Sequence, residues 1–283
     1  MKTRGLGDPL ERFLGGPVLW GGLVLGTLFA MGPFLWVFLA SVKTRVELYA
    51  TPITYIPVQP TFQNYVDAWT SRLTPFSRFF ANSLWVSSVT MVATIVISTL
   101  AGYALARFRF VGKNTLMLVF LATQMFPAVL LIAPLLSQWH ALGLIDTYQA
   151  LIYSNFSFTV PFTVWMLVGY FESIPRELEE SAMIGRFGAL LRIIVPLAAP
   201  GIAATAIFAF VSSWSELLFA TTFTTRTDMR TLSAGLLYMV GQYEIQWGQL
   251  GAGVMISTIP VAILFIFLQK HLIRGLTAGA LKG

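Results

Sequence analysis

The sequence predicts an all-α fold, that of a polytopic membrane protein with six transmembrane helices. Hydrophobic residues make up 56% of the 283 residues and charged residues only 11%, whereas a soluble domain carries about 25% charged residues. Six runs of 23 to 28 residues contain no Asp, Glu, Lys or Arg, and a transmembrane helix needs about 20 apolar residues. The predicted spans cover residues 17–42, 79–106, 114–138, 147–171, 193–222 and 245–269.

The first run, residues 17–42, is predicted to be a span that is retained. It is longer than the apolar core of a signal peptide, which has roughly 7–15 residues. The preceding segment, residues 1–16, mixes Asp8 and Glu11 with basic residues, unlike the positive flank of a signal peptide. We therefore expect residues 1–16 to form a short cytoplasmic N-terminal segment.

The five later runs are predicted to be helices rather than strands. Each is continuously apolar, whereas a membrane-spanning strand shows about ten residues of alternating hydrophobicity. A further run, residues 231–243, has only 13 residues, which suits an interfacial or re-entrant segment better than a span. The membrane domain is thus expected to cover residues 17–274 and to be followed by a tail at 275–283.

The distribution of Lys and Arg predicts the orientation. With the N-terminus inside, twelve of the 18 Lys and Arg residues fall in inside segments and six in outside segments. Because these residues accumulate in the cytoplasmic loops of membrane proteins, both termini are expected in the cytoplasm. We attribute the net charge of +6 to this orientation rather than to nucleic-acid binding.

The chain lacks the residues that catalysis or ion coupling would need within the membrane. The six charge-free runs contain no acid, base or histidine, although embedded enzymes and ion-coupled carriers place such groups there. There is no cysteine, and the two histidines lie far apart, so a metal site is not expected. The stretch Gly112-Lys113-Asn114 lacks the glycine and hydroxyl of a phosphate-binding loop. The sequence therefore predicts no catalytic residue and no bound cofactor.

Polar side chains within or next to the spans allow two interpretations. Buried amides need hydrogen-bond partners, so these residues could join neighbouring helices. They could instead line a path for a neutral hydroxylated solute, because amides both donate and accept and aromatic faces suit sugar rings. The candidates for such a path are Asn82, Gln124, Asn155, Trp214 and Glu216.

The loop at residues 172–192 has the pattern of a separate amphipathic helix. Pro175 suits a first helical position, and Glu177 favours the positive N-terminal end. One interpretation is a helix that lies on the lipid surface, and the alternative is a helix docked in a groove of a cytoplasmic partner. Three acids, at positions 177, 179 and 180, favour a protein partner over an anionic membrane. The apolar face would comprise Leu178, Ala182, Phe187 and Leu190 or Leu191.

Several stretches carry a family resemblance. Residues 174–182 read Ile-Pro-Arg-Glu-Leu-Glu-Glu-Ser-Ala, and residues 193–197 read Ile-Ile-Val-Pro-Leu. They resemble the opening and the close of E-A-A-x-x-x-G-x9-I-x-L-P, the ATPase-contacting loop of permease subunits in binding-protein-dependent ABC importers. Further stretches are similar to the carbohydrate branch of that family, and the ending is especially like the second, maltose/trehalose-type permease. These stretches are Asn82-Ser83, residues 102–107, residues 214–220 and residues 275–283.

The resemblance implies a role for the 172–192 loop in coupling to an ATPase. It departs from the family pattern in length, because Pro196 follows Glu180 by 16 residues where the pattern gives 19. The loop is therefore three residues shorter. The residues expected to contact the ATPase are Glu177, Leu178, Glu180, Ser181, Ala182, Gly185 and Phe187.

The resemblance also implies a type I ABC importer permease architecture and a function. The chain would import a sugar, such as maltose, trehalose or another di- or oligosaccharide, across a bacterial cytoplasmic (inner) membrane by alternating access. Its partners would be a homologous second permease, two ATPase subunits that bind ATP and Mg, an extracytoplasmic solute-binding protein and membrane lipid, with no nucleic acid. Three alternatives stay open: a permease for another polar solute such as a glycerol-phosphate, a stand-alone facilitator, and a scaffold for a membrane enzyme.

Overall fold

The computed structural model describes residues 17–180, 185–241 and 245–280, and every regular element in these ranges is a helix. The chain divides into two compact units. The first combines residues Met1–Ala68 and Glu244–Ile256, and the second combines Trp69–Tyr243 and Ser257–Gly283. The expectation of an all-α fold is confirmed for the described part of the chain.

The first unit contains α2 (Pro17–Ser41) and α3 (Arg45–Leu48), together with the start of α4 (Gln63–Thr70) and of α15 (Trp247–Ala280). The Asn64 amide holds these pieces together, because it donates to the carbonyls of Ser41 at 2.8 Å and of Lys43 at 2.7 Å. Gly248 allows α15 to approach this amide, since a Cβ there would lie 2.6 Å from the Asn64 side chain.

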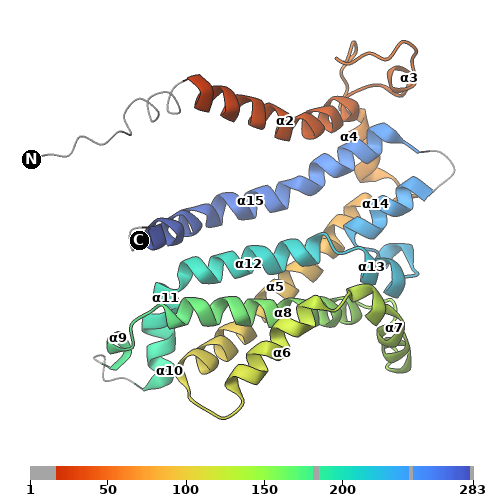
Figure 1. Ribbon diagram of the computed structural model, residues 1–283. Coiled ribbons are helices and arrows are strands. Elements are labelled where there is room, and N and C mark those ends of the chain that lie inside the picture. The colour runs from red at the N-terminus through yellow and green to blue at the C-terminus, as the bar shows by residue number, and fades with distance from the viewer. Residues whose placement is uncertain (1–16, 181–184, 242–244, 281–283) are drawn as a thin grey trace, which may run out of the picture. The chain divides into compact units, whose positions relative to one another are not determined.

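The second unit is a helical bundle built around α5 (Phe76–Arg107). Helix α5 packs along α8 (Tyr148–Glu172) and α12 (Ala199–Trp214), and α8 also contacts α6 (Lys113–Met125) (Figure 1). One end of the bundle carries α9 (Glu177–Glu180), α10 (Arg186–Ala189), η2 (Leu190–Ile194) and α11 (Val195–Leu197). The other end carries η1 (Ala128–Leu131), α7 (Ile132–Ala141), α13 (Leu218–Phe223), η3 (Thr227–Met229) and α14 (Leu232–Gly241).

Hydroxyl groups join the two central helices of this bundle. The side chains of Thr94 and Thr159 hydrogen-bond at 2.9 Å, and those of Ser98 and Thr163 at 2.6 Å. All four residues are buried. Small hydroxylated side chains let two helices approach closely while these hydroxyls find a partner in place of water, so α5 and α8 are bonded near their middles as well as packed.

The structure corrects the expected continuity of two spans. Within the described residues, four helices are long and apolar enough to cross a membrane, and there are up to six candidate spans if each of two bent helix pairs counts as one. The predicted third span, 114–138, turns by 93° between α6 and the following helix. Phe126 is extended there, because the residue before a proline, here Pro127, is disfavoured in the helical region.

The predicted fifth span, 193–222, is likewise not one helix. Residues 187–197 meet α12 at 78°, next to Pro200, which has no N–H to continue the helical hydrogen bonds. At its other end α12 stops at Trp214, and a separate helix, α13, begins at Leu218. The Glu216 carboxylate accepts hydrogen bonds from the amides of Phe219 and Ala220, which starts the new helix as a capping group does.

Candidate functional site

Both ends of the 172–192 loop are anchored in the core of the bundle. Leu190 and Ile194 are 2% and 0% exposed, and they belong to a cluster with Tyr103 and Phe171 from α5 and α8. Ile174, at the start of the loop, packs against the same cluster. The loop therefore leaves the bundle and returns to it at one apolar site.

A buried ion pair adds a polar anchor beside this cluster. The Arg107 Nε group donates to one carboxylate oxygen of Glu179, and the Tyr103 hydroxyl donates to the other at 2.8 Å. The side chains of Arg107 and Glu179 are only 7% and 13% exposed. We call these three residues, Tyr103, Arg107 and Glu179, the Glu179 clamp.

Two further bonds run between the end of α5 and the start of the loop. The Arg107 guanidinium donates to the carbonyl of Ile174 at 3.0 Å, and the Arg176 guanidinium donates to the carbonyl of Ala106 at 3.2 Å. These bonds cross in both directions, so the loop is tied to α5 by main-chain acceptors as well as by the clamp. The family-like stretch 102–107 thus contacts the described part of the other one, residues 174–180.

Several described residues between the two ends of the loop are exposed. Leu178 is 45% exposed and Phe187 is 65% exposed, although both are large and apolar, and Glu177 and Gly185 are exposed too. Glu180 is the last residue of α9, while Ser181 and Ala182 lie outside the described residues. The structure shows two four-residue helices here, α9 and α10, where the sequence pattern suggested one.

Asn82, a residue of the predicted solute path, holds a loop at the opposite end of α5. Its amide donates to the carbonyls of Asp228 at 2.8 Å and Arg230 at 2.9 Å, and its oxygen accepts from the Tyr148 hydroxyl at 2.8 Å. The neighbouring Ser83 hydroxyl accepts from the amide of Leu232 at 2.7 Å. The pair Asn82-Ser83 is therefore a structural clamp, and its contact with solute stays a prediction.

Of the other predicted path residues, Asn155 and Glu216 bond locally, whereas Trp214 and Gln124 bond to segments distant in the sequence. Asn155 donates to the carbonyl of Leu151 in its own helix at 2.9 Å, and the Trp214 indole donates to the carbonyl of Ser257 at 3.2 Å. Glu216 caps α13, as described above. Gln124 donates to the carbonyl of Phe158 at 3.2 Å and is thereby attached to α8.

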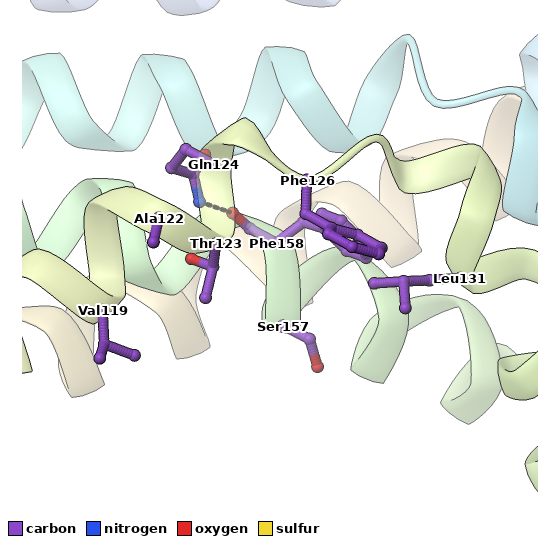
Figure 2. Close-up of a pocket in the computed structure, with 8 residues that line it drawn as sticks. All are labelled: Val119, Ala122, Thr123, Gln124, Phe126, Leu131, Ser157 and Phe158. Atoms are coloured by element: carbon purple, nitrogen blue, oxygen red, sulfur yellow. Dashed lines mark hydrogen bonds between the residues drawn. The ribbon is translucent and has the colours of Figure 1, made fainter.

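A cavity of about 470 Å³ lies between α6, the α6–η1 turn and α8 (Figure 2). Gln124 is the one predicted path residue among its lining side chains, and the others are mostly apolar. Such a wall offers few hydrogen bonds to a sugar, whose recognition needs convergent polar groups. The lining residues are Val119, Ala122, Thr123, Gln124, Phe126, Leu131, Ser157 and Phe158.

Asp146 forms a third clamp, which the sequence did not predict. Its carboxylate accepts from the amides of Thr225 at 2.6 Å and Arg226 at 2.9 Å. Partial burial raises the pKa of Asp146, but hydrogen bonds from the Thr225 hydroxyl and from these amides outweigh it and hold the pKa below its ordinary value. The residue has a φ of 59°, a left-handed conformation that Asp tolerates.

Titratable side chains do not gather into a metal site in the ranges that the structure describes. No group of three or more His, Cys, Asp and Glu side chains lies close enough there to hold an ion. The described part of the second unit is a helical bundle with anchored loops.

Comparison with known proteins decides the family. Residues 70–278 match the model of the binding-protein-dependent transport system inner membrane component. The chain belongs to this family. The suspected resemblance is confirmed, and the protein is an inner-membrane transport component rather than an enzyme.

Full-length relatives support the same assignment. The sulfoquinovosyl glycerol transport system permease protein SmoH of Agrobacterium fabrum is 40% identical over 98% of this chain and 95% of its own length. The trehalose/maltose transport system permease protein MalG of Thermococcus litoralis is 35% identical over 93% and 95%. A chain in the crystal structure of a bacterial ABC transporter that imports alginate has the same fold, with a TM-score of 0.78, 21% identity and coverage of 93% and 98%.

Proposed function

We propose that this chain is the permease subunit of an ATP-driven importer for a glycoside, a sugar joined through its anomeric carbon to a second sugar or to glycerol. The identity over nearly the whole length to the sulfoquinovosyl glycerol permease carries the proposal. Two further relatives support a glycoside cargo. They are the trehalose/maltose permease and the trehalose permease SugB of Mycobacterium tuberculosis, which is 34% identical over 92% of this chain. The cargoes named for all three share a glycosidic bond.

The proposed partners follow from the 172–192 loop. Its ends are buried in the bundle and its middle presents Leu178 and Phe187, a pattern that suits an element pushed by another subunit. We infer two ATPase subunits that bind ATP and Mg at this end, a homologous second permease, and an extracytoplasmic solute-binding protein at the opposite end. Alternating access would then require the bundle to move with the loop.

Reconstitution tests this function. The assembled complex in liposomes should import a glycoside only with internal ATP and external binding protein, and the cargo should be identified with sulfoquinovosyl glycerol, trehalose and maltose. The chain alone should neither hydrolyse ATP nor accumulate sugar. Equilibration of sugar by the chain alone would make it a facilitator, and uptake driven by a proton or sodium gradient would make it a secondary carrier.

Labelling from each side tests the proposed orientation, with both termini in the cytoplasm. The chain has no cysteine, so single cysteines report without background. Phe187→Cys is expected to react with a membrane-impermeant maleimide only from the cytoplasm. Val58→Cys is expected to react only from outside, and the Val58 side chain that it replaces is 72% exposed. Reversed labelling of both would overturn the orientation, while the family assignment would stand.

A further inference from the structure

We propose that Glu179 is a positioning residue for transport, which fixes the start of the 172–192 loop to α5 so that force on the loop moves the bundle. This inference rests on the proposed function of an ATP-driven importer. It assigns to Glu179 a role different from that of its neighbours on α9, which were expected to contact the ATPase.

The first support is the opposite placement of neighbouring residues. Glu179 is 13% exposed and bonded to α5, whereas Leu178 beside it is 45% exposed. One turn of helix thus presents an apolar side chain outward and a carboxylate inward. A force applied at the outward side chain reaches α5 through the inward one, with no flexible segment between them.

The second support is how completely the clamp occupies its hydrogen-bonding groups. Each carboxylate oxygen of Glu179 has a donor, and the Arg107 guanidinium serves both this carboxylate and the carbonyl of Ile174. A planar guanidinium that donates through two of its nitrogens fixes orientation as well as distance. Because a buried ion pair stabilises a fold little more than apolar packing would, we assign its value here to the fixed geometry.

The third support is the path beyond Arg107. Helix α5 is joined to α8 through the hydroxyl pairs Thr94–Thr159 and Ser98–Thr163. Tyr103, itself a member of the clamp, also packs edge-on against Phe171 of α8, with ring centroids 6.3 Å apart. A displacement at the clamp therefore moves α5 and α8 as one body, and with them the centre of the bundle.

The test measures sugar imported per ATP hydrolysed in the assembled complex. Glu179→Gln keeps the side chain's shape and removes its charge, so the ATPase subunits should still co-purify while import per ATP falls about fivefold or more, because one partner of a buried pair loses its compensation. Arg107→Gln should act alike, and the double variant should be no worse than either single one. Glu172→Gln is the matched control and should leave import per ATP unchanged. Glu172 pairs with Lys113 at the same end of the bundle but is 51% exposed.

Cross-linking gives a second measurement that does not depend on the native pair. In a variant that combines Arg107→Cys with Glu179→Cys, a thiol-reactive cross-linker of Arg–Glu length should restore the coupling that the reduced variant has lost. Tyr103→Phe, which removes one hydrogen bond, should lower import per ATP less than Glu179→Gln. Block of transport by the cross-link would overturn the proposal, because the loop would then have to leave α5 in each cycle.

The remaining outcomes are equally decisive. Loss of the ATPase subunits from the Glu179→Gln complex would make Glu179 a docking residue, and unchanged import per ATP would remove it from coupling; either result overturns the proposal. Failure of the unmodified complex to import sugar would instead contradict the proposed function, so the two failures are distinguishable.

Discussion

The two ends of α5 each hold a loop, but with different chemistry. At the N-terminal end, Asn82 and Ser83 use neutral side chains to bond main-chain groups of residues 228–232. At the C-terminal end, Tyr103 and Arg107 converge on one carboxylate, that of Glu179. The N-terminal contacts are several neutral hydrogen bonds. The C-terminal contacts centre on the charge of Glu179, with two further bonds to main-chain carbonyls. The C-terminal end should therefore respond more strongly to a single substitution.

Arg107→Ala is expected to have the largest effect. It leaves the Glu179 carboxylate buried without its cation, and breaking a buried pair from one side costs about 3–5 kcal/mol of folding free energy. The measurement is the melting temperature of the purified protein in detergent. Adding Glu179→Gln to this variant should recover part of the loss, because the uncompensated charge is gone. Equal losses in the single and double variants would show that the charge is unimportant.

Asn82→Ala is expected to be the next most costly substitution. It strands two main-chain carbonyls and the Tyr148 hydroxyl, and a buried polar group without a partner costs about 1–3 kcal/mol. We expect a total near the upper end of that range, together with faster proteolysis between residues 224 and 231. Asn82→Asp should not rescue the loop, since a carboxylate cannot donate to the carbonyls. A loss as large as that of Arg107→Ala would erase the contrast between the two ends.

The long helices of the bundle could be predicted from the sequence because charge-free runs report membrane burial directly. The predicted spans 79–106 and 147–171 correspond to helices Phe76–Arg107 and Tyr148–Glu172. The breaks could not be predicted, because prolines have two outcomes. Pro161 lies inside α8, whereas Pro127 follows the end of α6, where the chain turns by 93°. Tertiary contacts decide which prolines a helix tolerates.

The candidate site was predictable as a segment but not as a set of contacts. The motif resemblance located the 172–192 loop, yet the three acids at 177, 179 and 180 carry equal weight in the sequence. Only the fold shows that Glu179 turns toward α5. One signal was available: Tyr103 and Arg107 are four residues apart, and residues at that spacing share a helix face, which indicates a common polar partner.

Asp146→Asn tests the contact that holds Thr225 and Arg226, next to the segment bound by Asn82. It should cost less stability than Asn82→Ala, about 1 kcal/mol, because the amide oxygen can still accept hydrogen bonds. The pKa of Asp146 is lowered in the folded protein, so its contribution to stability is complete above the unfolded pKa of about 3.9 and is lost as pH falls through the lower folded value. The difference in melting temperature between the native protein and Asp146→Asn should therefore stay constant between pH 7 and pH 5. A difference between native protein and variant that changes within that window would contradict the lowered pKa.

The smallest effect is expected for Lys113→Ala, which isolates the contribution of burial. Lys113 pairs with Glu172 at 2.9 Å, at the same end of the bundle as the Glu179 clamp, but the two side chains are 25% and 51% exposed. Exposed pairs contribute about 0–1 kcal/mol, and raising the salt from 0.1 to 1 M shortens the screening length from about 10 to 3 Å. High salt should therefore abolish the effect of Lys113→Ala on melting temperature and leave that of Arg107→Ala. If both effects vanish in salt, solvent reaches the Glu179 clamp, and the clamp cannot hold the loop in one fixed geometry.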